Sequence, residues 1–466
     1  MWQFKSLIRT SFYTLCTLTS SHLAATSLLE AVNLSLENNL SLQASQLGIE
    51  QSEYNIGVSR SKFLPSLSAS ASTTYNKNET ILNQTPNTKS NYNSNDYSIS
   101  LSQSIFNMKD IYQYGTAKLD FSIEQLSHDN KIQTTISDVA SKYFEYLKSS
   151  AQIRATEAEL KSSFSREAQM KRNIQLGNTA ASEIYEVIAQ KEGINNRLRT
   201  LHKDQTVTLN DLAALVQYPI TPSQDIFDSV PLEPISDNDK NNIISEAIKL
   251  NNDIMVANKN LEKSRRELKE SSANFLPSVS MSASYRFDDA NNFDRTDPTA
   301  TGDSNSTSVG LTLSVPIYSG GSNYYDYQKS ALGIERNEIL LKDTLATTKS
   351  TINTSILNIN DYSSSILIYE NIIRANYSSY RGIQRAYQLG TRTITDLLAA
   401  ESKLFSALRD YESARYDYII EIINLEQIKG LLTIQSIEST MSLMGDISNQ
   451  TDDELVPKHL LSPPTS

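Results

Sequence analysis

The stretch YQLGTRTITDLLAAESKLFSALRDYESARYDY, from Tyr387 to Tyr418, decides the fold. A helix-compatible sequence runs up to it, a Leu-Gly pair ending at Gly390 interrupts that sequence, and a helical pattern resumes within a few residues. Glycine inside a helix costs about 1 kcal/mol relative to alanine and adopts backbone angles that other residues resist. We therefore expect Gly390 to lie at the turn of a helical hairpin, with Thr391 or Thr393 capping the returning helix.

The same break occurs a second time, because the chain contains an internal duplication. The segment NIQLGNTAASEIYEVIAQKEG places Gly177 in an equivalent turn, 213 residues before Gly390. KFLPSLSASAS at 62–72 likewise matches NFLPSVSMSAS at 274–284, at an offset of 212 residues. Registers kept over such a distance indicate two copies of one large unit.

The duplication divides the chain into segments. Residues 26–218 form the first repeat and 240–432 the second, and each should have the order helix, β-hairpin, long helix, hairpin apex, helix. The linker at 219–239 contains four prolines and should be irregular. Residues 433–466 are polar, end in SPPTS, and are expected to be a disordered tail.

Period-two patterns predict one β-hairpin in each repeat, at 66–106 and at 278–318. In the first, Leu67, Ala69 and Ala71 alternate with serines, and the second shows the same alternation. Four strands of about ten residues each are expected. The Asn-, Ser- and Thr-rich stretches between partner strands read as long loops.

Two environments fit this alternation. A soluble sheet packs its apolar face on a core, which is the commoner case, whereas a transmembrane β-barrel turns that face toward lipid. The leader sequence described below, the serine-rich opposite face and aromatic residues at the strand ends favour the barrel. Four strands cannot close a barrel, since about eight are needed, and an open edge in hydrocarbon leaves backbone groups unpaired. Spanning strands would therefore require the chain to oligomerise.

Helices account for most of each repeat. An apolar pattern at 28–62 predicts a first helix that ends before Pro65. No proline interrupts 109–175 or 323–387. Roughly 65 residues of helix reach about 100 Å, and a helix of that length must pack against others. A soluble coiled-coil scaffold would also use such helices, but it leaves the alternating strands unexplained.

Residues 1–25 read as a secretory signal peptide. Lys5 and Arg9 precede the apolar run FYTLCTL, and small residues come before Thr26. The only cysteine, Cys16, lies in this leader, so we expect the mature chain to lack thiols and disulfides. No run of 18 apolar residues is present, and no transmembrane helix is expected.

Composition argues against enzymes and nucleic-acid-binding proteins. The 466 residues carry a formal net charge of −11, which gives no electrostatic attraction for nucleic acid. The four histidines are scattered, and no Cys/His cluster has metal-ligand spacing. Phosphate-binding, serine-hydrolase and zinc-protease motifs are absent from the sequence. We expect no catalysis, no metal and no cofactor.

With these features the sequence resembles the outer-membrane efflux protein family of TolC-like channel-tunnels. The resemblance rests on the FLPS opening of both hairpins, the VPIYSGG segment at 315–321, and the motif G-T-x-x-x-x-D-L-L followed by Ala-x-x-x-Tyr and Gly-x-Leu within 387–432. It covers nearly the whole chain to about residue 432. The resemblance implies an α+β membrane protein, a homotrimer with four strands per chain. These would close one 12-stranded transmembrane β-barrel, continued by a long periplasmic α-helical barrel.

The resemblance also implies a function and partners. The family provides the exit duct of tripartite efflux pumps and type I secretion systems in the outer membrane of Gram-negative bacteria. The implied partners are further copies of the chain, outer-membrane lipid, a periplasmic adaptor (membrane fusion) protein, and an inner-membrane transporter of the RND, ABC or MFS type. Drug efflux and protein secretion both fit, because specificity resides largely in the transporter.

A gate at the periplasmic tip is a further implication of the resemblance. By motif position, Tyr387 and Arg392 match the closing tyrosine and arginine of the family. Ser182 and Glu183 match the polar and acidic groups that face them, and Asp396 matches an acidic ring at the channel mouth.

Two departures from the family's pattern would change the charge of this gate. Ala399 stands where a second aspartate is expected, and Glu183 replaces an aspartate. A simpler interpretation is also open, because Arg392 and Asp396 are spaced i,i+4. They could form only an exposed intrahelical pair, worth about 0.3–0.5 kcal/mol.

A second interpretation of the whole chain, from another class, is a secreted coiled-coil structural or adhesive protein without channel activity. Such a protein would be soluble without detergent and would have no heat-modifiable barrel. Simple fractionation therefore separates the two interpretations.

Overall fold

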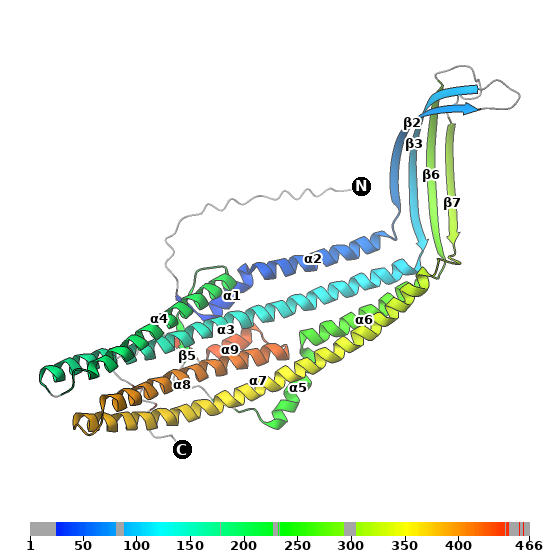
Figure 1. Cartoon of the computed structure of the whole chain (residues 1–466). Coiled ribbons are helices and arrows are strands. Elements are labelled where there is room, and N and C mark those ends of the chain that lie inside the picture. Colours follow the sequence, from blue (N-terminus) through cyan, green and yellow to red (C-terminus); the bar gives the residue numbers. More distant parts are fainter. Residues whose placement is uncertain are drawn as a thin grey trace.

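The molecule is elongated, with two helical hairpin turns at one end and, at the other, a sheet that rises at an angle to the helices (Figure 1). The computed structural model describes residues 25–80, 88–177, 179–226, 232, 234–292, 304–442, 444–446, 456 and 460. The predicted signal peptide lies outside these residues except for Ala25. Parts of the 219–239 linker and of the 433–466 segment lie outside them as well.

Helices form the body of the molecule. Their bounds are Leu28–Asn38 (α1), Leu40–Ser61 (α2), Met108–Gln175 (α3), Glu183–Val216 (α4), Asp237–Leu250 (α5), Asn252–Ala273 (α6), Ser322–Gln388 (α7), Ile394–Lys429 (α8) and Ile434–Met441 (α9). The two long helices expected from the proline-free stretches are α3 and α7, of 68 and 67 residues. Within the described part of the chain, none of the helices is long and apolar enough to cross a membrane.

A four-stranded antiparallel sheet stands at one end of the helices. Its strands are Ser66–Thr80 (β2), Thr88–Phe106 (β3), Ser278–Asn292 (β6) and Ser304–Ser314 (β7). The spatial order is β2-β3-β6-β7, so the hairpin of each repeat lies beside the hairpin of the other.

The strands differ in length from the prediction. β2, β3 and β6 contain 15, 19 and 15 residues, so much of what read as loop continues the ladder. Backbone hydrogen bonds can extend a hairpin that has no apolar face. The Asn- and Ser-rich sequence therefore gave no sign of these strand extensions. At the other end β7 stops at Ser314, before the predicted boundary at 318, and Pro316 has no N–H with which to extend the ladder.

The helices follow the order of the strands. Near the sheet α2, α3, α6 and α7 lie side by side in that order (Figure 1). Toward the hairpin turns, α4 packs on α3, while α8 packs on both α3 and α7. The largest fully buried side chains come mainly from α3 and α8, and they include Tyr143, Phe144, Phe405, Tyr411 and Tyr416. The core therefore lies where the two repeats meet.

The first helix of each repeat is broken, which corrects the prediction of one continuous helix at 28–62. α1 ends at Asn38, and the side chain of Asn39 accepts hydrogen bonds from the N–H groups of Ser41 and Leu42 at the start of α2. Asn251 caps α6 in the same way. An asparagine that accepts hydrogen bonds from the free N–H groups of the new helix lowers the free-energy cost of such a break.

The expectation of a disordered, unpacked tail at 433–466 is wrong for the part of it that the structure describes. Thr433 caps α9 with a capping box, and Ile437 is fully buried. Val456 and Leu460 are also buried, and the Leu460 carbonyl accepts a hydrogen bond of 3.0 Å from Arg374 Nε on α7. A few well-spaced apolar residues therefore suffice to dock a segment that is polar on average.

The linker and the C-terminal segment also contain short strands. Thr221–Pro222 (β4) pairs in parallel with Ala25–Thr26 (β1), and Gln224–Ile226 (β5) pairs with Met444–Asp446 (β8). The linker is therefore only partly irregular among its described residues. Its two short strands pair with β1, at the start of the described residues, and with β8, which follows α9.

Candidate functional site

The hairpin turns lie at the end of the molecule opposite the sheet (Figure 1). Gly177, between α3 and α4, has a φ of 70°, and Gly390, between α7 and α8, has a φ of 72°. A Cβ added at either position would meet nothing within 4 Å. The backbone angle, and not a lack of space, is therefore what favours glycine at both turns.

Asp396 has a structural role at the second turn. The Thr393 side chain accepts a hydrogen bond from Asp396 N at 3.1 Å, and the Asp396 carboxylate accepts one from Thr393 N at 3.2 Å. These hydrogen bonds lower the pKa of Asp396 below its ordinary value, and the charge of Arg392 acts in the same direction. Asp396 is therefore a charged helix cap.

Arg392 pairs with Asp396 along the same helix end. The distance from Arg392 Nη1 to Asp396 Oδ2 is 3.9 Å, and the two side chains are 58% and 40% exposed. A long, exposed pair of this kind contributes little to stability. The single chain thus contains the i,i+4 pair of the simpler interpretation, but Arg392 lies before the cap residue Thr393 and so outside α8. The guanidinium remains accessible.

Tyr387 and Glu183 are brought together from different hairpins. Tyr387 lies in the last turn of α7 and packs against the core, and Glu183 begins α4. Burial raises the pKa of Tyr387, and the nearby charge of Glu183 raises it further. Ser182 immediately precedes α4 and makes no side-chain hydrogen bond as its cap, so its hydroxyl is not committed to the helix end.

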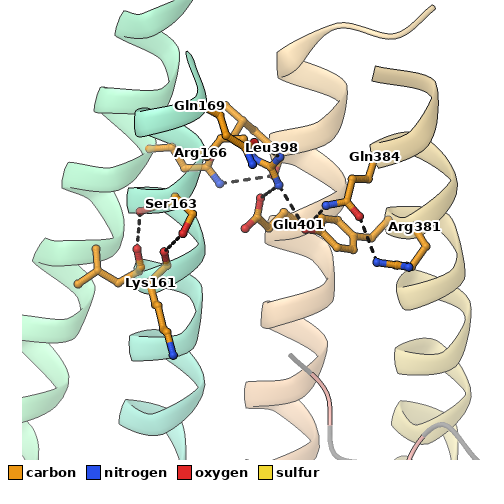
Figure 2. Close-up of polar contacts among 12 residues, drawn as sticks. Lys161, Ser163, Arg166, Gln169, Arg381, Gln384, Leu398 and Glu401 are labelled. Carbon is orange, nitrogen blue, oxygen red and sulfur yellow. Dashed lines mark hydrogen bonds and ion pairs between the residues drawn. The ribbon is translucent and has the colours of Figure 1, made fainter. Parts of the chain in front are cut away.

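A buried polar cluster behind the turns was missed by the sequence analysis. Arg166 on α3 points toward Glu401 on α8 (Figure 2), with 3.5 Å between Arg166 Nη2 and Glu401 Oε2. The two side chains are only 8% and 3% exposed. Arg166 Nη2 also donates to the Tyr380 hydroxyl on α7 at 3.2 Å, so three helices contribute.

One signal in the sequence could have found this cluster. Glu401 lies in the middle of an apolar stripe, four residues after Leu397 and three before Leu404, both of which are fully buried. A carboxylate at a core position requires a partner. The partner, Arg166, is 235 residues away, and no local pattern identifies it.

A second ionic contact joins the same two helices. Glu159 on α3 is buried, and its Oε2 lies 2.6 Å from Arg409 Nη1 on α8. Arg197 on α4 approaches the same oxygen to 3.3 Å. Glu159 is therefore bound by arginines from two other helices.

The sheet at the opposite end has two chemically distinct faces. On one face, serine hydroxyls hydrogen-bond across the strands at 2.8 Å, as in the pairs Ser68–Ser100 and Ser284–Ser308. On the other face, Leu67, Val309 and Leu311 are each more than 70% exposed. A soluble protein would cover an apolar face of this kind.

The described residues contain no group of three or more His, Cys, Asp or Glu side chains able to hold a metal ion.

Comparisons with known proteins agree with this arrangement. A family model described as outer membrane efflux protein matches residues 31–216 and 243–431. Outer membrane protein TolC of Escherichia coli (strain K12) is 24% identical over 456 residues, which cover 94% of this chain and 89% of that protein. Alkaline protease secretion protein AprF of Pseudomonas aeruginosa is 24% identical over 437 residues, which cover 89% of this chain and 86% of that protein.

A solved structure shows the same fold. The Campylobacter jejuni CmeC outer membrane channel matches with a TM-score of 0.74 and 18% sequence identity, covering 89% of each chain. At this identity the likeness speaks for the fold alone.

Proposed function

The chain belongs to the outer membrane efflux protein family, and from this premise we propose that it is the exit duct of a tripartite efflux pump or a type I secretion system. It lies in the outer membrane of a Gram-negative bacterium and extends into the periplasm. Conduction is passive and is gated at the helix tips. Both transport classes have support, because the family is named for efflux and AprF for alkaline protease secretion.

Closure of the sheet by further copies of the chain is supported by its two free edges. β2 and β7 are the outermost strands, and in a four-stranded antiparallel sheet they run in opposite directions. β2 of a second copy would therefore pair antiparallel with β7 of the first. Three copies supply the 12 strands that the family resemblance implies, and they leave no open edge in the membrane.

The helical layer offers the same two edges. Exposed apolar side chains recur every seven residues on both edge helices, and they are Leu40, Leu47 and Tyr54 on α2 and Tyr325, Leu332 and Ile339 on α7. A seven-residue repeat is the pattern with which helices pack side by side. A copy that pairs with a strand edge would therefore cover these side chains as well.

In such a trimer, the two faces of the sheet would lie in different environments, lipid outside and water inside. The apolar face that contains Leu67 and Leu311 would contact lipid, and the serine-rich face would line the lumen. Tyr97 and Phe287 stack on the apolar face, with ring centroids 6.2 Å apart. Aromatic residues at this position are typical of the boundary between lipid and water.

We place the gate at the hairpin turns, with Tyr387, Arg392, Asp396, Ser182 and Glu183 as its residues. The effect of the Glu183 charge on the pKa of Tyr387 supports an electrostatic coupling between the two hairpins. The accessible guanidinium of Arg392 could reach Ser182 or Glu183 of a neighbouring copy. A periplasmic adaptor would bind near these tips and shift them from a closed to a dilated arrangement. An inner-membrane transporter of the RND, ABC or MFS type would supply the energy.

The observation that carries this proposal is a two-faced sheet with two open edges. Detergent-extracted protein should migrate as a trimer that dissociates on heating, and it should form pores in planar bilayers. A product that is soluble without detergent and gives no pores would instead support the coiled-coil structural or adhesive protein.

A further inference from the structure

Among the described residues, three ionic contacts connect the α3/α4 hairpin to the α7/α8 hairpin, and Lys148–Asp417, at 2.7 Å, is the one farthest from the turns. The two contacts nearer the turns differ in polarity. The inner contact is Glu159–Arg409, at 2.6 Å, and the tip-side contact is Arg166–Glu401, at 3.5 Å. Both join α3 to α8, which run antiparallel because one approaches the turns and the other leaves them. The tip-side contact lies 11 residues from Gly177 on α3 and 11 residues from Gly390 on α8, roughly 16 Å behind each turn.

The polarity of the two contacts is reversed. At the inner contact the acid is on α3 and the base on α8, whereas at the tip-side contact the base is on α3 and the acid on α8. Sliding α8 along α3 by about two turns would place Glu159 against Glu401, or Arg166 against Arg409. Like charges facing each other in a buried site are strongly unfavourable. The reversed pattern therefore permits one register between the hairpins.

The charged groups of the two contacts differ in how many of their polar atoms have partners. Glu159 has two arginine partners, Arg409 and Arg197, at 2.6 and 3.3 Å. At the tip-side contact, Arg166 Nε has no hydrogen-bond partner among the described residues, and Glu401 Oε1 makes no hydrogen bond of normal geometry. Buried polar atoms without partners cost free energy, and water would satisfy them if the helices moved apart. The tip-side contact is therefore the one that separates more easily.

From this geometry we propose that Arg166 and Glu401 form a latch between the two hairpins of each chain. The Glu159–Arg409 contact keeps the helices in register, and the Arg166–Glu401 contact parts when the tip dilates. Tyr380 on α7 completes the latch through its hydrogen bond with Arg166. Arg166 and Glu401 are thus positioning residues that hold the gate closed. The inference rests on the gated-channel function proposed above.

A charge swap tests the latch in the full-length trimer in planar bilayers. R166E and E401R each place two like charges in the buried site. Each should raise the open fraction at least about tenfold, which corresponds to about 1.4 kcal/mol in the closed–open equilibrium. The double variant R166E/E401R restores an opposite pair and should return the open fraction close to that of the wild type. E401Q keeps the shape of the side chain without its charge, and it should raise the open fraction less than E401R does.

Lys191 and Glu167 provide the matched control. Their ion pair, at 2.9 Å, joins α3 to α4 within one hairpin, so K191E should leave the open fraction unchanged. Thermal dissociation of each trimer separates loss of the latch from general damage. If a charge-reversed single variant does not assemble, R166M replaces it with the same expectation of opening.

The outcomes distinguish the latch from the channel itself. A wild-type trimer that forms no pores would overturn the proposed function. If the wild type conducts but R166E, R166M and E401R leave the open fraction unchanged, the latch alone would be overturned. The same conclusion would follow if the double variant had as high an open fraction as the single variants.

Discussion

Asn39 and Asn251 stand at equivalent points of the two repeats, 212 residues apart, and make the same contacts. Each caps the helix that follows it. Each also donates a hydrogen bond through Nδ2 to the carbonyl near the end of another helix, Leu215 at 2.9 Å and Ile428 at 2.8 Å. The two asparagines thus connect α2 to α4 and α6 to α8 by the same contact in both repeats.

Replacing either asparagine should destabilise the protein. N39A and N251A each remove a helix cap and one donor to a partly buried carbonyl, and each should lower the free energy of unfolding by about 1–3 kcal/mol. The Leu215 carbonyl keeps a hydrogen bond of 3.0 Å from the Ser35 hydroxyl, so N39A should have the smaller effect. Denaturant unfolding of the detergent-solubilised protein measures the change. N258A is the control, because Asn258 is exposed and its amide donates only within its own helix, to Ile254. A change of equal size in N258A would contradict the capping role.

Two glycines with similar backbone angles should respond very differently to alanine. Gly390 and Gly430 have φ values of 72° and 78°, so G390A and G430A share a backbone strain of about 1–2 kcal/mol. A Cβ at Gly430 would also collide with the carbonyl oxygen of Leu250, whereas at Gly390 it meets nothing within 4 Å. Overpacking should add about 1–3 kcal/mol to the cost of G430A. Equal unfolding midpoints for the two variants would show that this close approach is unimportant.

The proposed gate residues predict a change in single-channel conductance. If Arg392 and Tyr387 close the tip, R392S and Y387F should each raise single-channel conductance. Because Arg392 and Asp396 form a long, exposed pair, R392S should hardly change thermal stability. Unchanged conductance in both variants would leave only the exposed Arg392–Asp396 pair. K191E is again a suitable control.

The stability of the fold should depend on pH through Glu401. Burial raises the pKa of Glu401 above its ordinary value of 4.5, Ser162 and Arg166 on α3 oppose this rise, and Glu159 adds to it. From α7, Tyr380 faces the same site, and the neighbouring side chain from α4 is the neutral Gln190, which donates to the Leu398 carbonyl. The buried carboxyl therefore binds its proton more tightly than a solvated one. Its contribution to the free energy of unfolding is fully present below pH 4.5 and is lost as the pH rises through the raised pKa.

The unfolding midpoint of the detergent-solubilised protein should accordingly fall as the pH rises across this window, and E401Q should remove this part of the fall. D396N is the matched control, because the pKa of Asp396 is lowered and its titration falls below the window. It should keep the pH dependence. A dependence that survives in E401Q would assign the effect to another group.

The two faces of the sheet predict opposite tolerance to charge. Leu311 and Thr312 are adjacent in β7 and lie on opposite faces. L311R would place arginine against lipid and should cost about 2–4 kcal/mol at the middle of the bilayer. T312R would place it in the lumen, where it should change conductance with little loss of trimer. Trimer yield and heat stability on gels compare the two variants, and equal yields would argue against the membrane assignment.

Much of the architecture followed from local patterns. The repeat offset predicted the duplication, proline-free stretches predicted the long helices, and Gly177 and Gly390 lie in the turns between them. The break at Asn39 was missed because an asparagine in an amphipathic stretch is compatible with both one helix and two. The packing of α9 was missed because only a few of its residues are buried, and average composition does not reveal them.

The sequence by itself determined where this chain turns, which segments alternate and which are helical, because glycine, proline and periodicity act through neighbouring residues. Only the tertiary structure decided that Arg166 meets Glu401, 235 residues away, and that Asn39 binds the carbonyl of Leu215, 176 residues away. The physical reason is that a buried charge or amide must find a partner, but its own surroundings in the sequence do not specify which one. That choice is made by the antiparallel packing of the two repeats, which brings α3 against α8.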